Sequence, residues 1–254
     1  MEHSGKGDPA KSIALLWRKR GESMPIGRSG LTVDSIVDAA IELADETSLA
    51  ELSMRAIAKR LGVGVMSLYT HIPGKNELID LMVDTVSGEV AIPIRTDRGW
   101  RSDIEDVVAN YRRLCLRHRW LVYIIETRPV IGPNTLAAWN VLLTPLDGIG
   151  LTEVEMDRIT SLLGGFVTTS ARREIELANV ERVTGESLNS WWMSNEALLT
   201  RVMDTSTTPV AERVGNVVQE GDLDQDNLRT GFAFQLDLLL NGIELLINTR
   251  TAAL

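Results

Sequence analysis

The sequence predicts an all-α protein, with a small N-terminal head of short helices followed by a larger helical domain. Apolar residues recur at three- to four-residue spacing through nearly every segment, which is the period of an amphipathic helix. Proline and glycine gather at the boundaries between segments, and no alternating apolar and polar run is long enough to predict a strand. With 254 residues, of which 44% are hydrophobic, the chain can bury a substantial core.

The N-terminal 30 residues are expected to form a flexible extension with a possible short helix. Residues 1–9 are expected to be disordered, whereas residues 10–20 (AKSIALLWRKR) show a short amphipathic pattern. The GESMPIGRSG stretch that follows contains three glycines and a proline, which predicts a linker.

After this linker the start and stop signals of helices become regular. Thr32 can cap a first helix, and Ser53 can cap a second one that Gly62 terminates. A very short third helix follows at about residues 64–71, and a fourth begins near Lys75. The first three of these helices are expected to form a compact three-helix head, and the fourth to connect it to the rest of the chain.

The AIPIRTDRGW stretch, with its proline and glycine, is the best candidate for a domain boundary. We therefore expect a first domain over residues 31–76, a connecting helix and linker over 77–98, and a second domain over 99–254. Two segments of the second domain are too apolar for helices that expose one side to water: LLGGF and FAFQLDLLLNGIELLI. Their composition predicts burial on two sides, which suggests a subunit interface. Helical patterns in this domain lie at about 100–118, 120–127, 134–147, 152–182, 187–203, 209–219 and 226–249.

The net charge of −9 is unevenly distributed. Residues 11–30 carry five basic residues and one acidic residue, and residues 50–76 carry four basic residues and one acidic residue, whereas most of the acidic excess follows residue 90. No uninterrupted apolar run reaches membrane-spanning length and the first residues do not resemble a secretion signal, so we expect a cytoplasmic protein without a membrane partner. A single cysteine, Cys115, allows no intrachain disulfide, and we interpret it as a small buried hydrophobe.

The segment RAIAKRLGVGVMSLY has the pattern of a helix-turn-helix. This motif requires a small residue where its two helices cross, for which Ala58 is suited, and a left-handed turn four residues later, for which Gly62 is suited. Residues 64–71 would then lie on or near a helix that faces the DNA major groove. The basic residues Arg18, Lys19 and Arg20 could form a minor-groove arm, although a solvated tail is the simpler interpretation.

Residues 31–84 resemble the tetracycline-repressor (TetR) family. The resemblance rests on the SMRAIAKRLGV second helix, the SLYTHI third helix and the PGKNEL opening of the fourth. Residues 99–148, with GW, LRHRWL, ETRP, IGPNTL and LDGIGL, also resemble the C-terminal domain of the tetracycline-repressor branch. The resemblance implies a homodimer on a near-palindromic double-stranded DNA operator and a small-molecule effector that changes the spacing of the two heads.

From the residues and this resemblance together we predict the sites. Tetracycline with magnesium is not expected, because LIDLMVDTVSGEVAI lacks the histidine that the branch uses in its fourth helix, and we expect neither metal nor cofactor. The aromatic residues of the second domain are mostly expected in its core, and Trp191 and Trp192 would cover a cavity or meet the partner subunit. The predicted ligand-binding residues are Trp120, Arg128, Asn134, Trp139, Phe166, Thr169 and Arg173. The predicted DNA-binding residues are Thr32, Ser53, Arg55, Gly64, Val65, Met66, Ser67, Tyr69, Thr70, His71 and Lys75.

The leading hypothesis is a repressor that a small molecule releases from its operator. The alternative is a constitutive DNA-binding regulator or activator without a ligand, since the cavity follows from resemblance alone. A helical enzyme is a distant third hypothesis, because the sequence has no recognisable nucleophile–base set, paired carboxylates or phosphate-binding loop.

Overall fold

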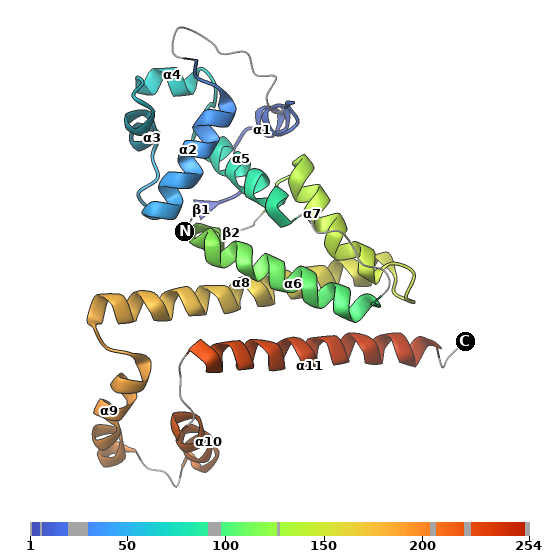
Figure 1. Cartoon of the computed structure of the whole chain (residues 1–254). Coiled ribbons are helices and arrows are strands. Elements are labelled where there is room, and N and C mark those ends of the chain that lie inside the picture. Colours follow the sequence, from blue (N-terminus) through green and yellow to red (C-terminus); the bar gives the residue numbers. More distant parts are fainter. Residues whose placement is uncertain are drawn as a thin grey trace. The chain divides into compact units, whose positions relative to one another are not determined.

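A computed structural model describes residues 2–5, 7–19, 30–90, 98–125, 128–203, 207–220 and 225–251. The all-α prediction is confirmed, with one small addition (Figure 1). Two-residue strands β1 (Glu2–His3) and β2 (Ile124–Ile125) pair in parallel, with Glu2 opposite Ile124. The chain forms two compact units, residues 1–171 and 172–254, which are treated separately below.

The first unit contains the predicted head and the helices that follow it. Side-chain caps begin two head helices as predicted: the Thr32 hydroxyl accepts from the Ser35 amide at 3.0 Å, and the Ser53 hydroxyl from the Ala56 amide at 3.2 Å. The helices are α1 (Pro9–Leu16), α2 (Val33–Glu46), α3 (Met54–Leu61), α4 (Val65–Tyr69), α5 (Lys75–Ser87), α6 (Trp100–Arg117), α7 (Pro133–Leu143) and the start of α8 (Glu153–Thr184), with the short 3-10 helices η1 (Gly88–Val90), η2 (Arg119–Tyr123) and η3 (Thr144–Leu146).

The predicted helix at 120–127 is found only in part, over residues 120–123, and residues 126–127 lie outside the described part of the chain. The chain there forms η2 and then β2, since the Ile124 backbone becomes extended and pairs with the N-terminal strand. A strand of two residues is too short to leave an alternating pattern in the sequence.

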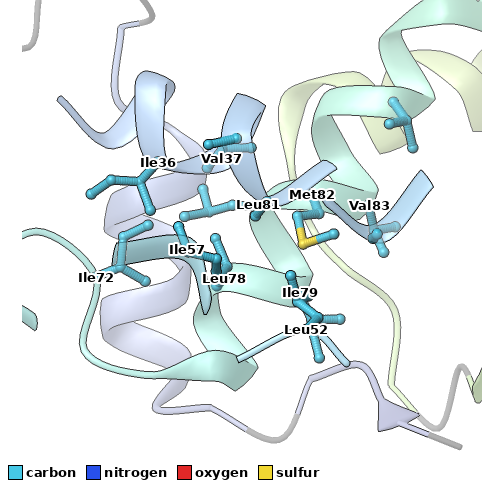
Figure 2. Packing of buried hydrophobic residues seen from close by; sticks show 14 of the residues in the cluster. Ile36, Val37, Leu52, Ile57, Ile72, Leu78, Ile79, Leu81, Met82 and Val83 are labelled. Atoms are coloured by element: carbon cyan, nitrogen blue, oxygen red, sulfur yellow. The ribbon is translucent and has the colours of Figure 1, made fainter. Parts of the chain in front are cut away.

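The hydrophobic core of the head is continuous with that of the helices around it (Figure 2). Ile36, Ile57, Leu68 and Leu78 come from four different helices and are fully buried in it. The same cluster extends to Trp120, in η2. Because buried side chains pack at nearly crystalline density, this shared core mechanically couples the head to the elements that follow it.

Three buried acidic residues on α5 organise the surrounding elements. Glu77, Asp80 and Asp84 lie at i, i+3 and i+7 and therefore on one side of the helix. Asp84 accepts hydrogen bonds from the backbone amides of Asn134 (3.0 Å) and Thr135 (2.9 Å), and so caps the N-terminus of α7. The other two carboxylates bind the N-terminal extension.

The expectation of disorder for residues 1–9 is wrong for the part that the structure describes. The amide of Gly5 donates to Asp80 at 3.0 Å, and the amide of Asp8 donates to Glu77 at 3.0 Å. The helix α1 then packs along α5, with Leu16 buried in the core. The composition of residues 1–9 could not reveal this order, because the carboxylates that accept these hydrogen bonds lie about 70 residues away in the sequence. The predicted linker falls largely outside the described residues.

Stability at neutral pH is expected to increase in the variant Asp80→Asn. Burial raises the pKa of Asp80 above its usual value, while hydrogen bonds from the Gly5 amide and the Ser12 hydroxyl oppose the shift and the Glu77 charge adds to it. The native state therefore binds more protons than the unfolded state between the two pKa values, and stability declines as pH rises through that window. An asparagine has no such charge to desolvate and can still accept from Gly5.

The measurement is thermal unfolding from pH 4 to 8, with Asp147→Asn as the control at an exposed position. The Asp80→Asn variant should melt above the wild type at pH 7, and the difference should shrink toward pH 4. A lower melting temperature for Asp80→Asn at pH 7 would contradict this expectation.

The second unit contains the end of α8, followed by α9 (Leu188–Val202), α10 (Pro209–Glu220) and α11 (Gln225–Thr251). Helix α11 has apolar residues on two opposite sides. Leu236, Leu240 and Ile243 are buried, whereas an opposite set is exposed, consisting of Phe234, Leu238 and Leu245.

Candidate nucleic-acid interface and junction cavity

The turn between α3 and α4 has the geometry that the sequence predicts. Gly62 has φ 67° and ψ 28°, the left-handed conformation that glycine adopts without strain. Its position lets the Val63 amide donate to the Ala58 carbonyl at 3.0 Å, which closes α3 before α4 begins at Val65. The two helices thus form a tight helix-turn-helix.

Helix α4 presents one side to solvent and the other to the core. Leu68 is fully buried, whereas Met66 and Tyr69 are 75% and 43% exposed. Thr70 is also exposed, and its hydroxyl donates to the Ser67 carbonyl at 2.7 Å. The buried leucine holds α4 on the head, and the exposed tyrosine and methionine lie on its outer side. This arrangement fits a helix whose outer side can enter a DNA major groove.

The remaining predicted DNA residues surround α4 less uniformly. Gly64 is exposed, and Ser67 is half-buried. Val65 and His71 are half-buried too, and Val65 packs against the hydrophobic core, which leaves it less surface for bases. The other predicted contacts lie at or near the starts of α2, α3 and α5, where backbone amides attract phosphate: Thr32, Ser53, Arg55 and Lys75.

Arg60 is engaged within the head. Its guanidinium makes a two-pronged contact with Glu46, at 2.7 Å for both nitrogens, and a 3.1 Å contact with Glu42. The hydrogen bond from Arg60 lowers the pKa of Glu46, so this carboxylate stays ionised. The contacts fasten α3 to α2, and Arg55 and Lys59 are the other exposed cations of α3.

A cavity of about 690 Å³ lies where the head meets the following helices. This volume is in the range of small-molecule sites. Its lining combines apolar side chains such as Ile41 and Leu81 with charged groups, and it includes residues of α1, α2, α5, η1 and the start of α7. A ligand in it would contact the head and the second domain at once.

A buried histidine ties the two sides of this cavity together. His118 lies 2.9 Å through Nδ1 from both carboxylate oxygens of Asp45 in α2, and 3.2 Å through Nε2 from Glu89 in η1. The indole N–H of Trp120 donates to the same Asp45 at 2.8 Å. Any shift of α2 relative to η1 must therefore disturb this network.

The structure does not gather the seven predicted ligand residues around one described cavity. Asn134 lines the junction cavity and donates its side-chain amide to Asp84 at 3.2 Å. Trp120 is a core residue instead, because its ring is buried and its N–H is already bonded. Trp139 is about half exposed, with its N–H 3.4 Å from Thr160.

The other four predicted ligand residues are not among the residues that line that cavity. The side chain of Arg128 is exposed, and its carbonyl accepts from the Ser4 hydroxyl. Phe166 is half-buried, whereas Thr169 and Arg173 are exposed and share one side of α8 with Leu162, by their spacing of seven and eleven residues. Of the tryptophan pair, Trp191 is exposed, and its ring meets that of Trp192 edge-on at 5.1 Å.

Sequence reasoning missed the polar residues that join the head to the second domain. Asp45, Asp84, Glu89 and His118 were not singled out, although they line the cavity. One signal was available, because acidic residues interrupt the apolar pattern of α5 at helical spacing. This pattern indicates buried carboxylates that need hydrogen-bond partners, and not a side of the helix exposed to water.

Comparison with known proteins decides the family. Residues 36–82 match the profile described as bacterial regulatory proteins, tetR family. Residues 92–247 match the tetracyclin repressor-like C-terminal domain, which is more than half of the chain. The chain belongs to the TetR family. It is therefore a transcriptional regulator of that family and not an enzyme.

Individual relatives agree with this assignment. The HTH-type transcriptional repressor DrrR1 of Streptomyces coeruleorubidus is 34% identical over 250 residues, which cover 98% of this chain and 90% of that protein. The Streptomyces coelicolor TetR family protein ActR in complex with actinorhodin has a TM-score of 0.70 at 26% identity, covering 84% of this chain and 94% of that one. An Acinetobacter baumannii TetR variant in complex with minocycline shares the fold, with a TM-score of 0.59 at 19% identity. The match covers 85% of this chain and 98% of that one. These relatives thus support the assignment of the chain to the TetR family of transcriptional regulators.

Proposed function

We propose that the protein is a homodimeric repressor which binds a near-palindromic operator through α4 of each subunit and leaves it when a small molecule binds. The observation that carries this proposal is the helix-turn-helix itself: α4 is anchored by Leu68 and presents Met66 and Tyr69 outward. We place the DNA-binding domain at residues 31–76, the connecting segment at 77–98 and the ligand-binding and dimerisation domain at 99–254. This role in transcription places the protein in the cytoplasm.

At the operator, α4 would enter the major groove while helix N-termini meet the phosphates on either side. Gly64, Met66 and Thr70 offer few hydrogen-bonding groups toward bases. Thymine methyl contacts and DNA shape would therefore carry much of the sequence discrimination. The exposed cations Arg55 and Lys59 would supply the phosphate attraction that the acidic second domain opposes.

Dimerisation is supported by the exposed apolar sides of the long helices. The stretch Thr230–Arg250 of α11 is long and apolar enough to cross a bilayer, with a mean hydropathy of 1.3, and only 17% of it is buried. In a DNA-binding regulator, such a helix is better explained by a partner subunit that covers Phe234 and Leu238 than by lipid. On α8, Leu162 and Val180 are exposed as well.

We assign the effector to the junction cavity. ActR binds actinorhodin and the Acinetobacter TetR variant binds minocycline. By analogy, an organic effector here would lie among α2, α5 and α7, where Asp45, Asp84 and His118 already connect the head to the second domain. An effector that prefers a displaced head would shift the population away from the DNA-binding spacing of about 34–36 Å.

The test is a footprint of the purified protein on the DNA upstream of its own gene and of the neighbouring genes, followed by a thermal-shift screen of small molecules. We expect two protected half-sites related by a two-fold axis, and a compound that both stabilises the protein and releases the DNA. A footprint without symmetry would refute the dimeric operator complex. Stabilising compounds that never release DNA would favour a constitutive regulator.

A further inference from the structure

We propose that residues 2–18 form a brace that fastens the DNA-binding head to the second domain and restricts how far the head can move. This segment is called the N-terminal brace below. The inference rests on the proposed function only for its regulatory consequence. Both family profiles begin after it, at residues 36 and 92, so the brace lies outside the two domains that define the family.

The brace is bound to the head and its connecting helix. The Asp8 amide donates to Glu77 at 3.0 Å, and the Ser12 hydroxyl donates to Asp80 at 3.2 Å. The Arg18 guanidinium forms an ion pair with Asp34 in the first turn of α2. The acceptors on α5 are buried, and hydrogen bonds to buried charged groups are stronger than those on the surface.

The same segment is bound to residues beyond the head. Glu2 and His3 pair with Ile124 and Ile125 as the β1–β2 ladder. The Ser4 hydroxyl donates to the Arg128 carbonyl at 3.1 Å. At the other end of the brace, the Trp17 indole donates to the Ile131 carbonyl at 2.9 Å.

Two glycines show how closely the brace fits its seat. A Cβ atom added to Gly7 would lie 2.5 Å from Glu77 Oε1, and one added to Gly5 would lie 2.7 Å from the Arg128 Cβ. No side chain larger than hydrogen fits either position without displacement. The brace therefore docks in one defined arrangement, against α5 and against the described residues Ile124, Ile125, Arg128 and Ile131.

Because one set of its contacts is to α5 and the other is to Ile124, Ile125, Arg128 and Ile131, the head cannot rotate against those residues while the brace stays fully docked. A movement of that kind must break the Trp17 and Ser4 bonds or the Glu77 and Asp80 bonds. The brace thus adds its docking energy to the cost of head displacement, which preorganises the head for DNA. An effector must also prefer the displaced head over the docked head by a larger factor in affinity in order to move the head.

The experiment compares Gly7→Val, which should force the brace off Glu77, with Lys11→Ala as a matched control at an exposed brace position. Fluorescent labels at Glu51→Cys in the head and Val154→Cys at the start of α8, in a Cys115→Ala background, report the head position by single-molecule energy transfer. Labelled chains are diluted with unlabelled ones so that each dimer carries one pair. Both label sites are exposed and lie outside the proposed DNA-facing residues.

We expect a narrow distance distribution for the wild type and Lys11→Ala, and a broadened or second distribution for Gly7→Val. Operator affinity of unlabelled Gly7→Val should fall roughly three- to tenfold, in proportion to the lost fraction of competent heads. Tryptic cleavage at Lys11 verifies release of the brace. If Gly7→Val fails to release it, deletion of residues 2–18 takes its place, with its fold checked by circular dichroism.

An unchanged distribution after the brace is released would overturn the proposal. A wild type that binds no operator would instead refute the proposed function, while the energy-transfer result would still decide whether the brace holds the head.

Discussion

Replacing Tyr69 with alanine is expected to weaken operator binding by roughly 10- to 100-fold, as loss of one anchoring groove contact typically does. Tyr69 is the last residue of α4, and its ring is 43% exposed beside the fully buried Leu68. Its hydroxyl can reach a phosphate while its ring contacts a sugar or a thymine methyl. Because the ring is exposed, its removal creates no cavity in the core, and the melting temperature and the dimer should be preserved.

The measurement is a gel-shift titration on the footprinted operator, with size-exclusion chromatography of the same sample. Tyr69→Phe is the matched variant: it keeps the ring and removes only the hydroxyl, so it should lose less affinity than Tyr69→Ala. Retention of tight, site-specific binding by Tyr69→Ala would mean that α4 is not the recognition helix.

The head was predictable because its signals are local. Thr32 and Ser53 cap helices a few residues away, and Gly62 is required at a turn within the same motif. Such signals depend on backbone geometry over five to ten residues, which a sequence displays directly. The double-sided apolar pattern of α11 was equally readable, since it follows from helical periodicity alone.

The N-terminal brace was not predictable, for a physical reason. Its order comes from hydrogen bonds to Glu77 and Asp80, two buried carboxylates that are distant in sequence. Local composition indicates a polar, glycine-containing tail, and nothing within residues 1–9 specifies an acceptor. The acidic residues of α5 gave a partial signal, because charges within an apolar helical pattern require partners.

The predicted ligand set shows the same limit. Aromatic residues at plausible spacing were assigned to a cavity, yet Trp120 is buried with its N–H bonded to Asp45, and Thr169 lies on an exposed side of α8. The cavity at the junction is lined instead by groups from six separate elements. Convergence of that kind is a property of tertiary packing and leaves no pattern in any single segment.

Substituting arginine for Leu238 is expected to convert the dimer to a monomer and to reduce operator affinity by about 100-fold or more, because each head would then bind its half-site alone. Leu238 is 55% exposed on the side of α11 that it shares with Phe234 and Leu245. If two subunits bury these sides against each other, the new guanidinium would be desolvated without a partner, at a cost of several kcal/mol per buried charge.

Ala233→Arg provides the control, since it adds the same charge to α11 at an exposed position about 140° around the helix from Leu238. Light scattering coupled to size-exclusion chromatography should show a monomer for Leu238→Arg and a dimer for Ala233→Arg. Circular dichroism should show α-helical folds for both, because Leu236 and Leu240 still pack inward. A dimeric Leu238→Arg variant would exclude this side of α11 from the interface. A monomer that still binds operator at wild-type affinity would show that the two heads need no physical connection.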